Sequence, residues 1–320
     1  MRIATWNING LRARIDYVDE WITARDPDLL AFQELKTPTD LFPHEHFEKL
    51  GYKSLVSGQK SWNGVAILSK QNIDIEEESN SLPGQEEAGA RFMSALVRTS
   101  SKKTLQFINL YCPNGKTLEH ADFEGKLRWF DSLTNQVSNE NHSHRILCGD
   151  FNIVPASVDT WKGEKGDGTM FHSTREREKM EALYQCGLID IFRQSKPEAQ
   201  EFSWWDYRSG AFHKNQGLRI DFILASQDLS RSVEQVFIDR EYRKKIGDLT
   251  ASDHAPVVRV VVGHGGPPRE TLQGEHVDEG PLEAGVVDDV VAHAERAVQG
   301  EGEGVRARGP AGHEEGQRGL

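Results

Sequence analysis

Polar side chains stand repeatedly at the ends of apolar segments that are predicted as strands. An unpartnered carboxylate costs several kcal/mol to bury, so carboxylates at several strand ends are expected to converge on a positive charge. A hard divalent cation with oxygen ligands, Mg²⁺ or Mn²⁺, is the simplest candidate. The pattern comprises Asn7 and Asn9 after residues 3–6, Glu34 after 29–33, Asp150 and Asn152 after 146–149, Asp221 within 218–224, and Asp253-His254 before 255–258.

Each position also has a purely structural explanation. An asparagine after a strand often belongs to a turn or a cap, and Glu34 could form an ion pair with Lys36. Residues 149–152 could form only a tight turn, and Asp253-His254 could cap a strand or a helix. The occurrence of all these residues in order along one chain favours a shared functional site.

Apolar periodicity alternates between strand and helix over residues 1–262. Strands are expected at 2–8, 29–35, 52–56, 64–70, 93–99, 104–112, 145–151, 218–225, 233–238 and 255–262. Helices are expected at 11–25, 123–137 and 174–186, the last after a capping box from Ser173 to Glu176. Residues 100–103 are predicted to form a hairpin turn. This order predicts an α/β fold in which two packed mixed sheets are flanked by helices.

Residues 263–320 differ abruptly in composition from the rest of the chain. They contain 13 Gly and neither an aromatic residue nor a lysine. Such a segment buries too little apolar surface to offset its ordering entropy. We therefore expect a folded domain at 1–262 and a disordered tail at 263–320, with at most a short helix near 281–298. A regulatory tail and an out-of-frame extension both remain open.

Charge and cysteine content narrow the class of protein. The formal net charge is −12, of which residues 263–320 carry −7 and residues 1–262 carry −5. A mildly acidic body does not exclude a DNA enzyme, because a divalent cation bound by carboxylates changes the sign of the local net charge. The three cysteines have no metal-type spacing, which favours reduced thiols. Without a signal-peptide pattern or a membrane-length apolar run, the chain is expected in the cytoplasm.

Five sequence blocks carry a specific resemblance. They resemble the signature motifs of the exonuclease III family, bacterial enzymes with apurinic/apyrimidinic (AP) endonuclease and 3′-exonuclease activity. The resemblance covers residues 1–262 and implies a four-layer α/β sandwich similar to deoxyribonuclease I. The blocks are 5–14, 32–36, 149–152, 217–221 and 252–256, supported by the stretches 42–43, 58–60, 64–68 and 202–208. Asn9 replaces an aspartate of some relatives, from which we expect little loss.

The resemblance implies a Mg²⁺ site, with Mn²⁺ as a possible substitute. Glu34 would be the principal carboxylate ligand, with Asn7 beside the metal and Asp253 in direct or water-mediated contact. The full set of residues expected at or near the metal is Asn7, Glu34, Asp150, Asn152, Asp253 and His254.

The same resemblance implies the catalytic residues. Asp150 would orient or deprotonate the attacking water, and Asn152 would hydrogen-bond to the phosphate. His254 would bind the scissile phosphate or act as a base, paired with Asp221. Tyr111 would stabilise the phosphate or the leaving group, although it could also simply pack on a neighbouring proline. The division of proton transfers among Asp150, His254 and Tyr111 stays open.

Contacts to DNA are implied at five further positions. Arg91 and Asn114 would contact the backbone, and the aromatic Trp204 would line a small apolar pocket with Leu218 and Ile220. Such a pocket would accept a flipped-out abasic sugar, whose extrusion costs less than that of an intact nucleotide. Taken alone, Arg91 could be a surface ion pair, and the aromatic residues near Trp204 could be core.

The sequence therefore predicts a monomeric, metal-dependent DNA repair hydrolase that acts on double-stranded DNA with abasic sites or 3′ ends. A same-fold phosphodiesterase for lipid or inositol phosphates is the first alternative, which the blocks at 202–208 and 217–221 disfavour. A non-catalytic DNA-binding module is the second alternative, and the presence of every expected site residue disfavours it.

Overall fold

Two six-stranded β-sheets form the centre of the protein in the computed structural model, which describes residues 1–98 and 104–261. The first sheet has the order β11 (Val233–Ile238), β12 (Val257–Val261), β1 (Arg2–Asn7), β2 (Leu29–Gln33), β4 (Val65–Lys70) and β3 (Tyr52–Ser57). The second has the order β5 (Asp74–Ser79), β6 (Phe92–Arg98), β7 (Thr104–Tyr111), β8 (Arg145–Asp150), β10 (Asp221–Ser226) and β9 (Leu188–Asp190).

Both sheets are mixed. In the first, β1 and β2 are parallel with Asn7 opposite Gln33, and in the second, β7 and β8 are parallel with Tyr111 opposite Asp150. The other described strand pairs are antiparallel. Because parallel strands end at the same edge, each sheet delivers the residues after two carboxyl ends to one place.

The inner faces of the two sheets pack together in an apolar core. Leu29 and Ile67 from the first sheet meet Phe107 and Ile146 from the second, all four buried. A polar contact crosses this core. The Nε2 of Gln33 donates to the Oδ1 of Asn109 at 2.7 Å, while the Nδ2 of Asn109 donates to backbone carbonyls of β2 and β4 at 2.8 Å. These buried bonds fix how the sheets sit on each other, since shifting one sheet would leave the amides unpartnered.

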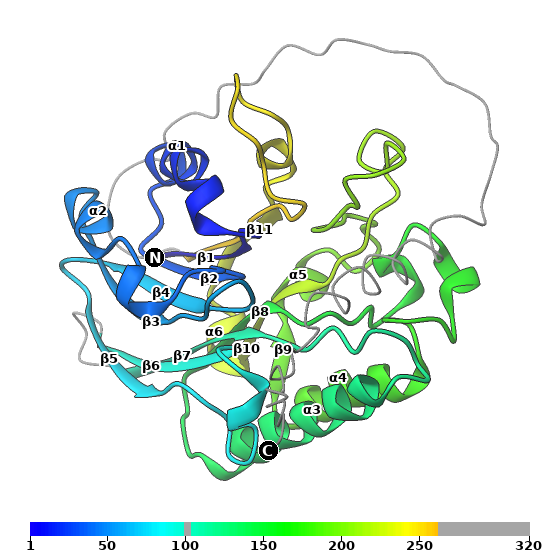
Figure 1. The fold of residues 1–320 in the computed structure, drawn as a ribbon. Helices are drawn as coiled ribbons and strands as arrows, with labels where there is room; N and C mark the ends of the chain where they lie inside the picture. Colours follow the sequence, from blue (N-terminus) through cyan, green and yellow to red (C-terminus); the bar gives the residue numbers. More distant parts are fainter. Residues whose placement is uncertain (99–103, 262–320) are drawn as a thin grey trace, which may run out of the picture. The chain divides into compact units, whose positions relative to one another are not determined.

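Helices cover the outer faces, as Figure 1 shows. The first sheet carries α1 (Ile15–Arg25) and α2 (His44–Lys49), and the second carries α3 (Ala121–Asn139) and α4 (Thr174–Gln185). The predicted capping box at the start of α4 is present. Short elements complete the fold: α5 (Ile191–Ser195), α6 (Gln227–Ser230), and the 3₁₀ helices η1 (Leu11–Ala13), η2 (Thr39–Leu41), η3 (Glu86–Ala88), η4 (Ser157–Asp159), η5 (Gly163–Gly166) and η6 (Arg240–Arg243).

The predicted α/β class with two mixed sheets between helices is confirmed, with local differences. The predicted helix at 11–25 is split into η1 and α1, and β10 begins at Asp221 instead of at residue 218. The strand β5 was not predicted because its sequence, Asp-Ile-Glu-Glu-Glu-Ser, has a single apolar residue and lies at an exposed edge. The predicted turn at 100–103 and the predicted tail at 263–320 lie outside the described residues. The strands that flank the turn, β6 and β7, are described.

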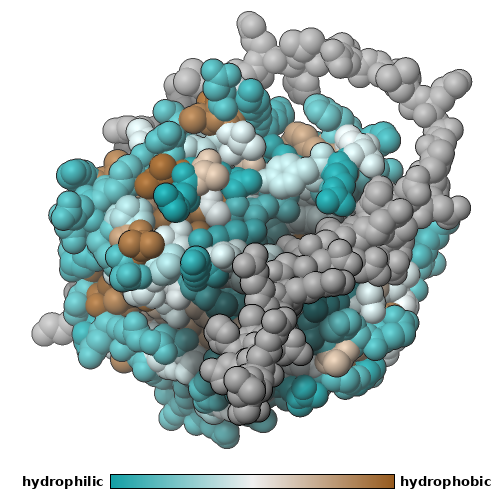
Figure 2. All heavy atoms as spheres, in the orientation of Figure 1, coloured by the Kyte–Doolittle hydropathy of each residue, from teal (hydrophilic) through white to brown (hydrophobic). Residues whose placement is uncertain are grey.

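The face shown in Figure 2 is largely hydrophilic, with hydrophobic residues in small separate groups. Among the described residues, none of the helices combines the length and the hydropathy needed to span a bilayer.

Candidate active site

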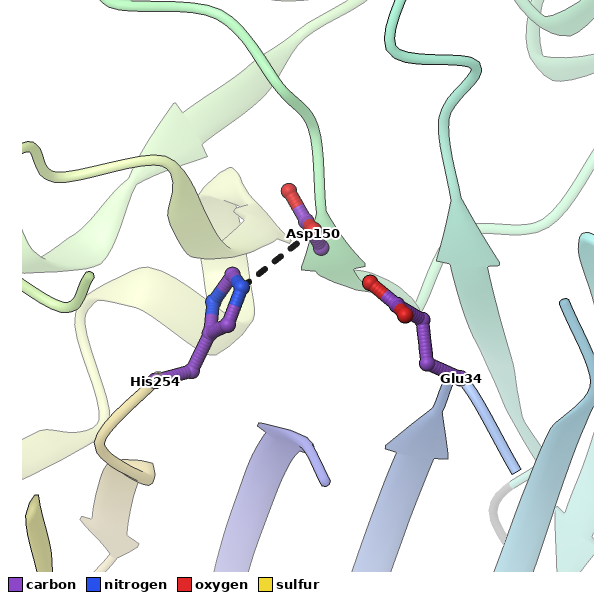
Figure 3. A group of neighbouring side chains, drawn as sticks. All are labelled: Glu34, Asp150 and His254. Atoms are coloured by element: carbon purple, nitrogen blue, oxygen red, sulfur yellow. Dashed lines mark ion pairs between the residues drawn. The ribbon is translucent and has the colours of Figure 1, made fainter. Parts of the chain in front are cut away.

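Glu34, Asp150 and His254 converge where the carboxyl ends of β2 and β8 meet the chain just before β12 (Figure 3). Each offers one ligand atom, and these atoms all lie within 4.8 Å of one another. The Nε2 of His254 is 3.8 Å from the Oδ2 of Asp150. Asp150 and His254 are buried, whereas Glu34 is partly exposed.

The backbone at these strand ends adopts uncommon conformations. Glu34 and Asn152 have φ values of 52° and 50°, in the left-handed region that non-glycine residues rarely occupy. Gly149 has a φ of 142°, and a Cβ there would lie 1.9 Å from the carbonyl oxygen of Leu110 on the neighbouring strand. Only glycine therefore allows β8 to approach β7 this closely just before Asp150. Strained residues of this kind persist where the surroundings hold them, and they cluster at functional sites.

Asn7 links the two carboxylates of the site. Its Nδ2 donates to Glu34 Oε1 at 2.9 Å and to Asp150 Oδ2 at 3.0 Å, while its Oδ1 accepts from the backbone of Asn9 at 3.0 Å. Asn7 is the last residue of β1, so one amide from the first sheet holds together acids from both sheets. In this orientation Asn7 orders the carboxylates through its amide nitrogen.

His254 belongs to a buried hydrogen-bonded chain. Its Nδ1 lies 2.8 Å from Asp221 Oδ2, which also accepts from the Oγ of Ser203 at 2.6 Å. Burial opposes a charge on His254, but Asp221 and then Asp150 outweigh this effect and raise its pKa to about 10. The imidazole is therefore cationic at neutral pH, with Nε2 directed at Asp150.

Asp150 has the opposite environment for an acid. Burial raises its pKa to about 7, and Asp221 and Glu34 add to this effect, while His254 and Asn7 counteract it. Its Oδ1 accepts the backbone N–H of Asn152 at 2.9 Å. A carboxylate with a pKa near 7 is suited to accept a proton from water at neutral pH.

The residues present fit a hard cation. Glu34 and Asp150 supply carboxylate oxygens that lie within 4.8 Å of each other. Lys36 Nζ lies 3.0 Å from Glu34 Oε2, so the ion pair considered from the sequence is present and would have to open for that oxygen to bind a metal. The cationic His254 donates hydrogen bonds instead of ligating, so it fits an anionic phosphate oxygen better than a metal.

Asp253 stands apart from this group. Its carboxylate accepts from Asn9 Nδ2 at 2.9 Å and from Trp204 Nε1 at 3.0 Å. Burial alone would raise its pKa, but His254 and these two donors lower it overall. The carboxylate of Asp253 is therefore ionised at neutral pH. Its hydrogen bonds connect Asn9, in the block at 5–14, with Trp204, in the aromatic block at 202–208.

Tyr111 ends β7 on the Glu34 side of the site. Burial raises the pKa of its hydroxyl, and the charge of Glu34 adds to this effect. The guanidinium of Arg91 lies 4.6 Å from the centre of the Tyr111 ring, and NH1 of Arg91 donates to the Tyr111 carbonyl at 3.4 Å. Arg91 therefore packs against a site residue and is no isolated surface ion pair.

Asn114 and Asn152 occupy the two loops that leave β7 and β8. The Nδ2 of Asn152 donates to the Cys112 carbonyl at 3.0 Å, and the Oδ1 of Asn114 accepts the backbone N–H of Lys116 at 3.1 Å. The side chain of Asn114 is thus ordered by its own loop, whereas the side chain of Asn152 is held by the loop that follows β7.

An apolar cluster lies beside the site. Trp204, Leu218 and Ile220 come together as predicted, and Val154 and Phe171 join them. Trp204 and Leu218 exchange a pair of backbone hydrogen bonds of 2.9 Å, which holds the segment before Asp221 against the aromatic block. Val154 and Phe171 were missed because they lie in an irregular loop with no periodicity to mark them.

Other aromatic residues of the block have different places. Trp205 is core, whereas Tyr207 is 48% exposed and accepts a hydrogen bond from Arg14 at 2.9 Å. Ser203 was not predicted as a site residue, although it lies inside the block at 202–208, whose aromatic residues were singled out from the sequence. Its hydroxyl binds Asp221 and receives the backbone N–H groups of Ile220 and Asp221 at 3.1 Å.

Comparison with known proteins places these features in context. The sequence model of the endonuclease/exonuclease/phosphatase family matches residues 4–254. Exodeoxyribonuclease III of Haemophilus influenzae is 35% identical over 267 residues, which cover 80% of this chain and 98% of that protein. A solved structure of a 3′ phosphatase from Neisseria, bound to a product DNA hairpin, is 36% identical with a TM-score of 0.74, covering 82% of this chain and 100% of that one. An AP endonuclease from Archaeoglobus fulgidus is 28% identical with a TM-score of 0.75, covering 82% and 99%.

Proposed function

Because this chain belongs to the endonuclease/exonuclease/phosphatase family, we propose that it is a DNA repair phosphodiesterase of the exodeoxyribonuclease III type. It degrades duplex DNA from 3′ ends, cuts 5′ to abasic sites and cleans blocked 3′ termini. The chain covers nearly the whole length of relatives that bear these activities in their names. The resemblance found in the sequence motifs is confirmed by these relatives.

The observation that carries the proposal is the convergence of Glu34, Asp150 and the cationic His254, whose ligand atoms lie within 4.8 Å of one another. The carboxylates of Glu34 and Asp150 would hold a Mg²⁺ ion, which would supply charge stabilisation for a phosphoryl oxygen. Manganese has the same ligand preference and is expected to substitute.

The protein's own groups have separable tasks in phosphodiester hydrolysis. Asp150 accepts the proton of the attacking water, and the new P–O bond forms as the bond to the leaving alkoxide breaks. Nε2 of His254 donates a hydrogen bond to a non-bridging phosphate oxygen, and Asp221 keeps the imidazole charged. Tyr111 lies on the Glu34 side, where its hydroxyl stabilises the leaving oxygen. Preorganised donors of this kind account for much of the rate in such reactions.

Lesion choice is assigned to the apolar cluster of Trp204, Leu218, Ile220, Val154 and Phe171. An abasic sugar has no base to unstack, and it presents the small, weakly polar body that such a cluster accepts. Arg91 and Asn114 are proposed to contact the backbone on the Tyr111 side. We also propose that residues 1–262 form the catalytic domain and that the protein acts as a monomer in the bacterial cytoplasm.

The test is cleavage of three labelled duplexes: one with a single abasic-site analogue, one intact and one with a 3′-phosphate, each in Mg²⁺ and in EDTA. Mg²⁺-dependent cutting 5′ to the lesion supports the endonuclease activity. A ladder from the 3′ end of the intact duplex supports the exonuclease, and release of phosphate supports end cleaning. Folded protein in Mg²⁺ that leaves all three duplexes uncut would overturn the proposal and favour another phosphodiester substrate.

A further inference from the structure

A completely buried ion pair lies beneath the candidate site. Lys126 of α3 and Glu176 of α4 are each 0% exposed, and Lys126 Nζ lies 2.5 Å from Glu176 Oε1. The other carboxylate oxygen, Oε2, accepts from the backbone N–H and the hydroxyl of Ser173 at 3.1 and 2.7 Å. The charge of Glu176 is thus compensated on both oxygens.

The remaining hydrogens of the Lys126 ammonium reach the two loops that carry site residues. Nζ donates to the backbone carbonyl of Asn152 at 2.6 Å and to that of Asn114 at 3.2 Å. An ammonium has three donors, and here each one has an acceptor. One buried charge therefore joins the loop after β7 to the loop after β8.

The contact to Asn152 bears on the site directly. Asn152 has a left-handed backbone with a φ of 50°, and its N–H donates to Asp150 Oδ1 at 2.9 Å. Such a conformation is held by its surroundings and is not intrinsically preferred. A charged donor on the Asn152 carbonyl holds the peptide so that its N–H keeps pointing at Asp150.

A gain in folding stability does not explain why this ion pair is buried. Replacing a buried ion pair by apolar groups is often neutral or stabilising, whereas removing one partner alone is costly. We propose that Lys126 is a positioning residue for phosphodiester hydrolysis. Its ammonium aligns Asn114 and Asn152 so that both asparagines contact the same phosphodiester. This inference rests on the proposed function.

Two variants separate positioning from stability. In Glu176→Gln the lysine loses its counter-charge but keeps the backbone carbonyls of Asn114 and Asn152 as acceptors. This variant is expected to melt at lower temperature with a kcat within about threefold of wild type. In Lys126→Met/Glu176→Gln no buried charge is left unpaired, but both carbonyls lose their donor. It is expected to be more stable than Glu176→Gln, with kcat on nicked or abasic duplex reduced at least tenfold and KM changed less than threefold.

Lys179→Met is the matched control. Lys179 also joins α4 to α3, through an ion pair of 2.7 Å with Asp131, but that pair lies on the surface and away from the site. Its kcat is expected to equal that of wild type. A kcat that falls in parallel with melting temperature across all variants, or a double variant with wild-type kcat, would overturn the inference.

Hydrogen exchange provides a readout without substrate. The Asn152 amide is expected to exchange at least tenfold faster in Lys126→Met/Glu176→Gln than in Glu176→Gln, at equal distance from the melting temperature. Equal protection in the two variants would contradict positioning. Wild-type protein that cuts no DNA would refute the proposed function alone, since the exchange comparison would still decide the role of Lys126.

Discussion

Asp150 and Asp253, two aspartates on either side of His254, show how residues of one type acquire different acidities. Burial raises the pKa of Asp150 to about 7, and the acids Asp221 and Glu34 strengthen the effect. Asp253 is partly exposed. Burial would still raise its pKa, but His254, Trp204 and Asn9 provide enough positive charge and donors to lower it. The first is poised to take up a proton near neutral pH, and the second stays ionised. Opposite environments for like groups are the usual mark of divided acid–base roles.

Asp150→Asn is expected to lower kcat by about 10³-fold or more, because it removes the proton acceptor with little change of shape. DNA binding is expected to stay within a few-fold of wild type. Single-turnover kinetics and an equilibrium binding titration measure the two quantities. Asp131→Asn, on the exposed face of α3, is the control, and near-normal turnover of Asp150→Asn would remove Asp150 from its assigned role.

Asp221→Asn is expected to lower the pKa of His254 from about 10 by removing the charge that most strongly raises it. A raised pKa stabilises the fold fully below the unfolded value of 6.5, and this contribution is lost as pH rises through about 10. Between pH 6.5 and 10, the free energy of unfolding should therefore fall less in the variant than in wild type. NMR titration of the His254 ring checks the pKa directly, and an unchanged titration would show that Asp221 does not control it.

At the scale of elements, the site depends on the residues that terminate the strands. Asn7, Glu34, Tyr111 and Asp150 stand at the carboxyl ends of two parallel strand pairs, one pair in each sheet. The apolar cluster, by contrast, is built from loops, with residues 154 and 171 on one and 204, 218 and 220 on others. The proposed catalytic residues thus stand at the ends of strands, and the proposed specificity residues stand on loops, which tolerate more change.

Leu218→Ala is expected to widen the apolar cluster and weaken lesion choice. Loss of apolar contacts in a specificity pocket is worth roughly 1–3 kcal/mol, or about tenfold or more in kcat/KM for the preferred substrate. The ratio of kcat/KM on abasic to intact duplex measures this. Leu183 is a buried residue of α4 that packs in a different apolar cluster, so Leu183→Ala is a control for lost packing. An equal fall of the ratio in both variants would argue that the cluster has no part in selection.

At the scale of the whole molecule, the candidate site exists because two sheets pack in one fixed arrangement. Asn7 and Glu34 come from the first sheet and Asp150 from the second, and the buried Gln33–Asn109 bond crosses between them at 2.7 Å. Like charges brought together in this way repel until a cation binds, so metal binding should stabilise the entire fold.

Magnesium is therefore expected to raise the melting temperature as well as to support cleavage. At a free concentration of about 100 times Kd, binding to the native state alone adds about 2.7 kcal/mol. EDTA should abolish both effects, and Glu34→Gln should lose most of the thermal shift. A Mg²⁺ shift that persists undiminished in Glu34→Gln would place the cation elsewhere.

Truncation after residue 262 is expected to leave the melting temperature and the rate of cleavage unchanged. The family match ends at residue 254, and the composition of residues 263–320 provides neither aromatic residues nor lysine for packing or phosphate contacts. Calorimetry and the abasic-duplex assay on the two chain lengths test this. A clear drop in melting temperature would show that the tail contributes to the fold.

Helices, the cap of α4 and several strand ends could be predicted from the sequence because each depends on residues that are close together in the chain. The long helices follow from apolar spacing, the start of α4 from its capping box, and the strand ends from the polar residues that interrupt apolar runs. Short or exposed elements such as β5 and α2 have too few apolar positions to produce a pattern. Glu34, Asp150 and His254 could be singled out together because sequence motifs preserve the order of residues along the chain, and the structure places these three side chains near one another.

The sequence by itself determined the inventory: which acids, amides and aromatics end which strands, and the α/β class that carries them. Only the tertiary structure decided their relations, such as the contact of Asn7 with both Glu34 and Asp150, the ion pair of Lys36 with Glu34, and the buried Lys126 beneath both loops. The physical reason is that the strength of a charge or a hydrogen bond depends on distance and burial. Both are set by the packing of residues far apart in the chain, which no local pattern encodes.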